Sequence, residues 1–373
     1  DGSTASVVAG PDGTWTVPNP GLNDGDTVTA VTEDPAGNTS GPATAVVDAV
    51  APTVALDDVL TNDSTPALTG TVSDPTATVV VNVDGVDYPA VNNGDGTWTL
   101  ADNTLPTLAD GPHTITVTAT DAAGNVGNDT AVVTIDTVAP NAPVLDPINA
   151  TDPVSGQAEP GSTVTVTYPD GTTATVVAGT DGSWSVPNPG NLVDGDTVTA
   201  TATDPAGNTS GPATAVVDAV APTVALDDVL TSDSTPALTG TVSDPTATVV
   251  VNVDGTDYPA VNNGDGTWTL VDNTLPTLAD GPHTITVTAT DAAGNVGTDT
   301  GVVTVDTTAP AAPVIDPVNG TDPITGTAEP GSTVTVTYPD GTTATVVAGT
   351  DGSWSVPNPG NLVDGDTVTA TAT

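Results

Sequence analysis

Residues 113–121 read HTITVTATD, and this stretch decides the class of fold. Apolar and polar residues alternate strictly along it, which is the period of a β-strand with one face buried and one in solvent. Working outward, TVVVNVDG at 78–85 and NNGDGTW at 92–98 carry Asp-Gly hairpin signals. TVTVTYPDGTTATVV at 163–177 predicts two strands around a Pro-Asp-Gly turn. No helical period is present, so the sequence predicts an all-β protein.

Internal repetition sets the domain organisation. APTVALDDVL at 51–60 recurs unchanged at 221–230, and the intervening sequence divides into two related modules, A and B. We expect the chain to be an internal piece of a longer array, since neither end coincides with a module boundary. The predicted modules are a partial B at 1–50, A at 51–138, B at 139–220, A at 221–308 and a partial B at 309–373.

Short strands with a turn every 8–12 residues predict an immunoglobulin-like sandwich of about seven antiparallel strands in each full module. The linkers AVAP and TVAP are short and contain proline, so we expect tandem modules arranged end to end as an extended rod. In module A the expected strands span residues 53–60, 67–72, 78–83, 86–91, 97–101, 113–120 and 129–136.

Each module has a single tryptophan in the pattern DG(T/S)W(T/S). We interpret it as the inward anchor of the fifth strand, because a core of Val, Ala and Leu without Phe or Met needs its volume. A platform for stacking sugars is the alternative. The five tryptophans are Trp15, Trp98, Trp184, Trp268 and Trp354.

Composition excludes several classes of function. The 373 residues contain 47 Asp and Glu but no Lys or Arg, giving a formal net charge of −47. Nucleic-acid binding is excluded because nothing can neutralise phosphates, and no basic patch can hold an anionic membrane surface. No apolar run is long enough for a membrane span. Cysteine is absent, the two histidines are His113 and His283, and every polar feature is repeated, so we expect no enzyme.

The acids fall at the two ends of each predicted sandwich. The loop DPAGN or DAAGN joins the sixth and seventh strands and faces the preceding module, as does an acid before Pro in the second-to-third strand loop. The preceding module contributes the Asp that ends its last strand and the acids of its fifth-to-sixth strand loop. The candidate metal ligands are therefore Asp48, Asp74, Asp110, Asp121, Asn125, Asp136, Glu159, Asp194, Asp196, Asp204, Asn208, Asp218, Asp244, Asp280, Asp291, Asn295, Asp306 and Glu329.

Each junction thus gathers about four carboxylates with no cationic side chain to offset them. Two such charges about 4 Å apart repel by roughly 4 kcal/mol at an effective dielectric of 20. Calcium suits this set because it takes six to eight oxygen ligands in flexible geometry, whereas Mg²⁺ needs a tight octahedral shell and zinc prefers Cys or His. Simple solvation of the acids in a halophilic setting is the alternative. NNGDGTW lacks the helices and closing Glu of an EF-hand.

TATDPAGNTSGPATAVVDAVAP at 201–222 and GQAEPGSTVTVT at 156–167 resemble the bacterial immunoglobulin-like repeats of giant repeats-in-toxin adhesins, in their extender or stalk region. The resemblance covers every module. It implies that calcium at the junctions stiffens a stalk, at a bacterial cell surface or secreted, which projects a distal ligand-binding region for adhesion or biofilm formation. It assigns calcium binding to the last-strand Asp, the Asp and Asn of DPAGN, and the acid before Pro. The first junction departs from the pattern, with Glu33 where the full module B has Thr203.

The partners implied are neighbouring modules of the same longer chain and an unidentified distal ligand, without nucleic acid or direct membrane insertion. Two alternatives remain open at this point. One is a calcium-independent acidic filament or surface-layer protein. The other is a set of immunoglobulin-like modules whose loops bind glycan or a protein partner.

Overall fold

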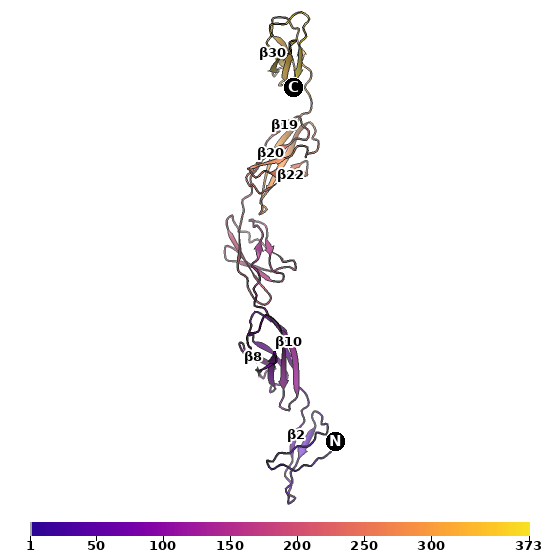
Figure 1. Ribbon diagram of the computed structural model, residues 1–373, viewed down its shortest axis with the longest axis vertical. Coiled ribbons are helices and arrows are strands. Elements are labelled where there is room, and N and C mark those ends of the chain that lie inside the picture. The colour runs from indigo at the N-terminus through magenta and orange to yellow at the C-terminus, as the bar shows by residue number, and fades with distance from the viewer. Residues whose placement is uncertain (1) are drawn as a thin grey trace. The chain divides into compact units, whose positions relative to one another are not determined.

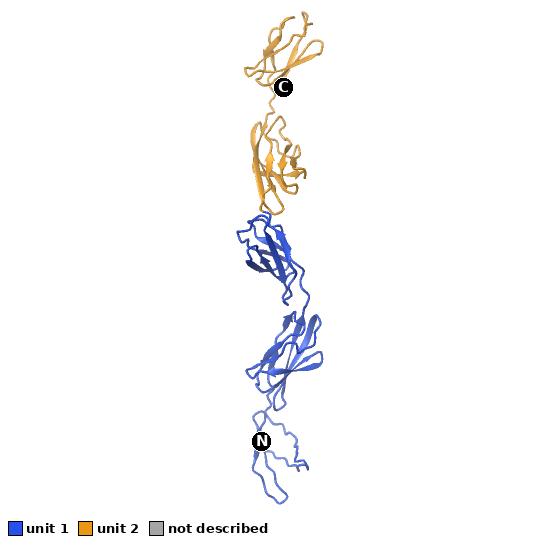
Figure 2. Ribbon diagram, turned by 90° about the vertical axis from the view of Figure 1, so that its left-hand side faces the viewer, with its two compact units in different colours: residues 1–218 blue, residues 219–373 orange. Residues whose placement is uncertain are grey.

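A computed structural model describes residues 2–373, and within them every regular element is a β-strand (Figure 1). No helix that could cross a membrane is present in the described part of the chain. The chain divides into two compact units, residues 1–218 and residues 219–373, coloured separately in Figure 2.

The central part of the first unit is a sandwich in which the two layers share a strand. The strand order is β3-β5-β8-β7-β6-β9-β10-β4, and β7 is hydrogen-bonded to both β6 and β8. This confirms the predicted all-β, immunoglobulin-like architecture. The strands are β3 Val54–Leu56, β4 Val59–Thr61, β5 Leu68–Val72, β6 Thr78–Val83, β7 Val86–Asn92, β8 Thr97–Leu100, β9 Gly111–Thr120 and β10 Val126–Ile135.

The first strand of this sandwich differs from the single strand expected over residues 53–60. It splits into β3, which pairs antiparallel with β5, and β4, which pairs parallel with β10. Two carboxylates hold the crossing point: Asp129 Oδ2 accepts the Leu56 N–H at 3.0 Å, and Asp58 Oδ1 accepts the Val132 N–H at 2.8 Å. The two acids thus satisfy a backbone N–H of β3 and one of β10 at the place where the first strand changes sheets.

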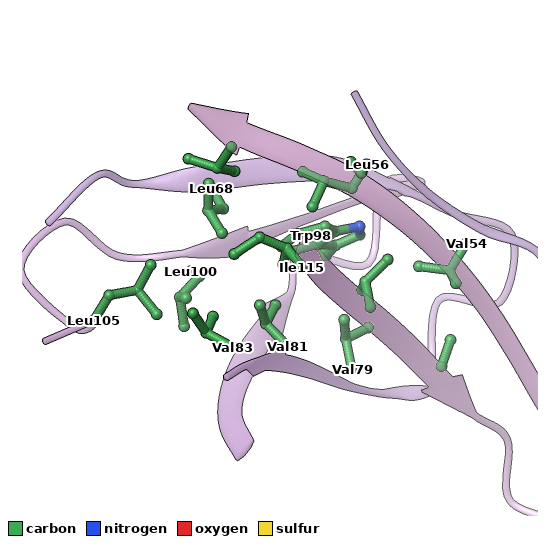
Figure 3. Close-up of a cluster of buried hydrophobic side chains, with 14 of the residues drawn as sticks. Val54, Leu56, Leu68, Val79, Val81, Val83, Trp98, Leu100, Leu105 and Ile115 are labelled. Carbon is green, nitrogen blue, oxygen red and sulfur yellow. The ribbon is translucent and has the colours of Figure 1, made fainter. Parts of the chain in front are cut away.

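The core is built from the inward residues of the alternating strands. Trp98 is fully buried and lies at the centre of the cluster in Figure 3, with Leu56 and Ile115 beside it. Its indole Nε1–H donates to the carbonyl of Ala55 at 3.1 Å. The ring packs so closely on β5 that a Cβ added at Gly70 would lie 2.7 Å from Trp98 Nε1, so this position requires glycine.

Residues 139–218 form a second sandwich with separate sheets, β11-β12-β15 and β14-β13-β16-β17. Here the buried Trp184 Nε1–H has no hydrogen-bond partner among the described residues, unlike Trp98. Tyr168 donates its hydroxyl proton to the carbonyl of Pro187 at 2.7 Å. The strands are β11 Val144–Leu145, β12 Val154–Gln157, β13 Thr163–Thr167, β14 Thr173–Val177, β15 Ser183–Val186, β16 Thr197–Thr203 and β17 Ala213–Val216.

Residues 2–50 contain only one strand pair, β1 Thr27–Ala30 with β2 Ala43–Val46. Nearly all of their side chains are exposed. Trp15 is 50% exposed here, so the predicted anchoring role of the tryptophan is confirmed for the four other tryptophans, which are buried, but is wrong for this one.

The second unit repeats both arrangements. Its first part has the order β18-β20-β23-β22-β21-β24-β25-β19, and its second part has the sheets β26-β27-β30 and β29-β28-β31. The strands of the first part are β18 Val224–Leu226, β19 Val229–Thr231, β20 Leu238–Val242, β21 Thr248–Val253, β22 Thr256–Asn262, β23 Thr267–Leu270, β24 Gly281–Thr290 and β25 Val296–Val305. Those of the second part are β26 Val314–Ile315, β27 Ile324–Thr327, β28 Thr333–Thr337, β29 Thr343–Val347, β30 Ser353–Val356 and β31 Thr369–Ala372.

The two classes of tryptophan give a stability prediction. Trp98→Phe removes an N–H that the Ala55 carbonyl accepts, whereas Trp184→Phe removes an N–H without a partner. Because the lost ring volume is common to both, Trp98→Phe should lower the free energy of unfolding of its own module by about 1 kcal/mol more. Hydrogen exchange followed by mass spectrometry resolves the two modules, and equal losses would contradict the assignment.

Candidate functional site

The loop DPAGN at 204–208 folds around its own first carboxylate. Asp204 Oδ1 accepts the backbone N–H groups of Gly207 at 2.7 Å and Asn208 at 2.9 Å, and Oδ2 accepts the Asn208 side-chain amide at 2.8 Å. Gly207 has a φ of +100°, a left-handed conformation that glycine adopts without steric cost. Aspartate, glycine and asparagine at these places therefore make one closed turn, and the residue Asp204 is only 7% exposed.

This turn contacts the end of the preceding sandwich. The same Asn208 Nδ2 that binds Asp204 also donates to the main-chain carbonyl of Asp136 at 2.7 Å. Asp136 follows β10, and its own N–H donates to the Thr61 carbonyl. A second bond runs the other way, from the Asn62 N–H to the carbonyl of Ala206 at 3.0 Å. The structure thus brings together three predicted site residues, Asp136, Asp204 and Asn208.

The junction before residue 51 has the same arrangement with fewer contacts. Asn125 Nδ2 donates to the carbonyl of Asp48 at 3.1 Å and to Asp121 Oδ2 at 2.8 Å. Asp121 Oδ1 accepts the N–H groups of Ala123 and Asn125. The structure thus brings together Asp48, Asp121 and Asn125, three of the predicted site residues.

The strand-ending carboxylates bind the linkers that follow them. Asp136 Oδ1 accepts the Val138 N–H at 3.1 Å, Asp48 Oδ1 accepts Val50 N–H at 3.2 Å, and Asp306 Oδ1 accepts Thr308 N–H at 3.0 Å. The fifth-to-sixth loop acids do the same. Asp110 accepts the N–H and hydroxyl of Thr137, and Asp280 those of Thr307. These acids therefore shape the linkers between modules.

The acids before proline bind within their own loops. Asp74 Oδ1 accepts the N–H and hydroxyl of Thr76, and Asp244 Oδ1 those of Thr246. The main-chain carbonyls of Glu159 and Glu329 accept the hydroxyls of Ser162 and Ser332.

The remaining predicted ligands lie as follows. Asp196 Oδ2 accepts the Val193 N–H at 2.9 Å beside Asp194, and the Asp218 N–H donates to the Ile148 carbonyl. In the second unit, Asp291 accepts both the N–H and the side-chain amide of Asn295. Asp218 and Asp291 belong to different units. No sequence pattern indicated Asn62, whose counterpart in the second copy is Ser232.

Hydrogen bonds set the ionisation of the turn carboxylates. Burial raises the pKa of Asp204, but the Asn208 amide and the loop N–H groups outweigh burial and hold the pKa below its usual value of 3.8. The Asn125 side chain lowers the pKa of Asp121, and Asn38 lowers that of Asp34 in the same way. Donors that bind the charged form favour it, so these acids stay ionised in the fold.

The junction offers oxygen ligands and no nitrogen or sulfur ligands. The Asp136 carbonyl and the Asp204 carboxylate converge on one point, the Asn208 amide nitrogen, at 2.7 and 2.8 Å. Over residues 2–373, no three Asp, Glu, His or Cys side chains group closely enough to hold a metal ion. Each junction in the first unit therefore supplies one loop carboxylate together with a main-chain carbonyl, and both are oxygen ligands of the kind that calcium takes.

Histidine is the only side chain of this sequence that can form an ion pair with an acid. His113 Nδ1 lies 3.6 Å from Asp84 Oδ2, and its Nε2 lies 2.8 Å from the Ala109 carbonyl. Asp84 lies in the turn between β6 and β7, and His113 lies near the start of β9 of the same module.

Comparison with protein families gives two matches. The family described as "Bacterial Ig-like domain" matches residues 49–137 and 212–307, and the family described as "Bacterial Ig domain" matches 139–219 and 309–373. Halomucin of Haloquadratum walsbyi is 28% identical over 335 residues, covering 70% of this chain. The matched region spans 4% of the length of halomucin.

Two solved structures are similar in sequence along most of the chain. One is a tetra-tandem repeat in the extending region of a large adhesion protein, 31% identical, covering 86% of this chain and 95% of its own, with a TM-score of 0.23. The other is a Ca²⁺-stabilised adhesin with which an Antarctic bacterium binds ice, 25% identical, covering 87% and 98%, with a TM-score of 0.27.

The Asn208 amide predicts a specific loss of junction stability. Asn208→Asp replaces the donor to the Asp136 carbonyl by a carboxylate beside Asp204. We expect a loss of about 1–3 kcal/mol, because the acceptors lose their donor and two like charges face each other. Exchange at residues 136–138 and 204–210 should accelerate. Asn38→Asp is the matched control, because it changes the corresponding turn at residues 34–38, where no hydrogen bond from the Asn38 amide to another module is described. An equal effect there would refute the junction role.

Acid should destabilise the same turns. Asp121 and Asp204 have lowered pKa values in the fold, so the unfolded chain binds protons first and the stabilisation is complete only above the unfolded value. As the pH falls from about 5 through 3.8 toward the folded values, the melting temperature should drop. Asn208→Ala should flatten this dependence for residues 139–218. An unchanged slope in thermal melting would show that Asn208 does not set it.

Proposed function

Because the chain is a tandem array of bacterial immunoglobulin-like domains, we propose that it is an extracellular spacer, part of the stalk of a bacterial surface adhesin. The observation that carries the proposal is the direct bonding of one module's loop to the end of the preceding module. Asn208 reaches the carbonyl of Asp136, and Asn62 reaches Ala206 in return. A spacer transmits position along its length, and this requires each module to hold the next.

The acidic surface supports an extracellular location for this chain. A net charge of −47 keeps a long repeat protein soluble and prevents modules from sticking to each other at random. The matched families are structural domain families, and we propose no catalytic role. A repeats-in-toxin origin, a part in biofilm formation and a distal ligand-binding region belong to the same proposal, with neighbouring modules as the immediate partners.

Calcium is the ion that we propose for the junctions. Asp136, Asp204 and Asn208 would hold it at one junction, and Asp48, Asp121 and Asn125 at the other in the first unit. Bound calcium would supply positive charge where this chain has none. The ion would neutralise the loop carboxylates and bridge the two modules. This bridge would stiffen the spacer.

A calcium-independent filament is the second candidate, and one observation favours it. The junction bonds from Asn208 and Asn62 use only uncharged donors, and within residues 2–373 no three acids group around one point. Modules joined in this way need no ion to be connected. The difference between the two candidates is therefore the effect of calcium on stiffness and stability.

Small-angle scattering and thermal melting, each with calcium and with a chelator, test the proposal. With calcium at 100 times its dissociation constant, the folded form gains about 2.7 kcal/mol and the melting temperature rises. The maximum dimension obtained from scattering should vary less among the molecules in solution when calcium is bound. If chelation alters neither the scattering profile nor the melting temperature, the calcium-independent filament is correct.

The paired variant Asp136→Ala with Asp204→Ala locates the effect. It should abolish the calcium-dependent gain at residues 136–208 while each module stays folded, since Asp136 is absent from the apolar cluster of its module and the Asp204 carboxylate binds groups of its own turn. Asp95→Ala together with Asp181→Ala is the matched control, because these two acids serve turns within their own modules. Equal loss of the calcium response in the control would place the ions elsewhere.

A further inference from the structure

Tension along a tandem array acts on the first and the last strand of each module, because the chain enters a module through one and leaves it through the other. In module A at 51–138 these are the divided first strand, β3 with β4, and the last strand, β10. In module B at 139–220 they are the segment that begins with β11, and β17. The contacts that hold these terminal strands decide which module unfolds first under load.

The terminal strands of module A pair directly with each other. Val59–Thr61 of β4 lie in parallel register with Val133–Ile135 of β10, and the Asp136 N–H then donates to the Thr61 carbonyl at 2.9 Å. Because the strands are parallel, load on the start of one and on the end of the other pulls them past each other. The evenly spaced hydrogen bonds between them therefore share the load and break together.

Within the described residues, module B makes this contact at one point. Ile148 forms a single parallel bridge with Val217, and the Asp218 N–H donates to the Ile148 carbonyl at 2.9 Å. Just before that point the chain still belongs to the other sheet, because the Asp146 N–H donates to the Ser155 carbonyl of β12. Load on module B is therefore carried by one bridge where module A has a ladder.

Two carboxylates connect the terminal strands of module A a second time. Asp129 of β10 accepts a backbone N–H of β3, and Asp58 accepts one of β10. Counting back from the Asp that ends the last strand, Gly211 takes the place of Asp129 in module B. Counting back from the residue whose carbonyl accepts the N–H of that Asp, Leu145 takes the place of Asp58. We call the ladder and these two carboxylate bonds the terminal clamp of module A.

Both terminal strands of module A have further contacts that module B lacks. Trp98 donates its indole N–H to the Ala55 carbonyl of β3, whereas the Trp184 indole N–H has no partner among the described residues. The last strand β10 has ten residues, all in register with β9, whereas β17 has four residues in register with β16. The two strands on which load acts are thus held more weakly in module B.

We propose that the chain unfolds in two stages under tension, module B first and at lower force, with module A intact until the force is higher. Module A at 221–308 repeats the terminal clamp, with Asp299 and Asp228 accepting the corresponding N–H groups and a parallel ladder between β19 and β25. Module B, once unfolded, lengthens the chain while both A modules keep their fold. This rests on the proposed spacer function and deepens it, since it assigns the spacer a response to load.

Single-molecule pulling of the full 373-residue chain by its two ends tests the order. Pulling in chelator keeps the outcome separate from the spacer proposal, which scattering and melting with calcium test. The chain has no cysteine, so an engineered disulfide can lock one module at a time. Ile148→Cys with Val217→Cys locks module B, and Leu60→Cys with Thr134→Cys locks module A at 51–138, because residues in register on neighbouring strands are close enough to be bridged.

Each oxidised variant should lose one unfolding event of the wild type and regain it in reductant. With module B locked, a low-force event should be lost while the events of both A modules remain. With module A locked, a high-force event should be lost. If the event lost on locking module B lies at the same force as that lost on locking module A, or at a higher one, the proposal is wrong.

Asp129→Ala tests whether the terminal clamp sets the force. The Leu56 N–H loses its acceptor, so the unfolding rate of module A at a fixed force should rise about tenfold. The unaltered module A at 221–308 is the reference within the same molecule. Asp95→Ala is the matched control, because Asp95 binds Thr97 in a hairpin turn of the same module and leaves the clamp intact. Equal acceleration by the two variants would show that the clamp does not set the order.

Discussion

Every carboxylate in this chain must find its partners among uncharged groups, because the chain has no lysine or arginine. The solution is local. Asp95 accepts the N–H and hydroxyl of Thr97, and Asp181 accepts those of Ser183. These bonds lower the pKa of both acids, so the charged form is the one that the turn stabilises. These acids thus hold the hairpin turns of the sandwich. They also repel one another, and the fold must tolerate that repulsion.

The junction follows from the same constraint. No Lys or Arg is available for a salt bridge between modules. The contact is made instead by an amide, with Asn208 donating to a main-chain carbonyl. The Asp204 carboxylate accepts a hydrogen bond from the same amide and so orients it. Connection between modules therefore rests on neutral hydrogen bonds.

Local sequence patterns predicted much of the fold and of the candidate site. Strict alternation placed the strand over residues 113–120, which the structure extends to Gly111–Thr120, and the repeated DPAGN loop indicated Asp204 and Asn208 as a pair. The split of the first strand could not be predicted, because Asp129, which holds it, is distant in sequence. Asn62 gave no signal because it acts through its backbone N–H, and the second copy has Ser232 in its place.

Preorganisation explains how so few bonds can join two modules. The Asp204 turn is closed by three hydrogen bonds of its own, and Gly207 already has the backbone conformation that it requires. Asp136 is likewise fixed by β4 through the Thr61 carbonyl. The entropy of ordering both surfaces is therefore lost when each module folds, rather than when the modules meet. Two hydrogen bonds and a short linker then suffice for contact.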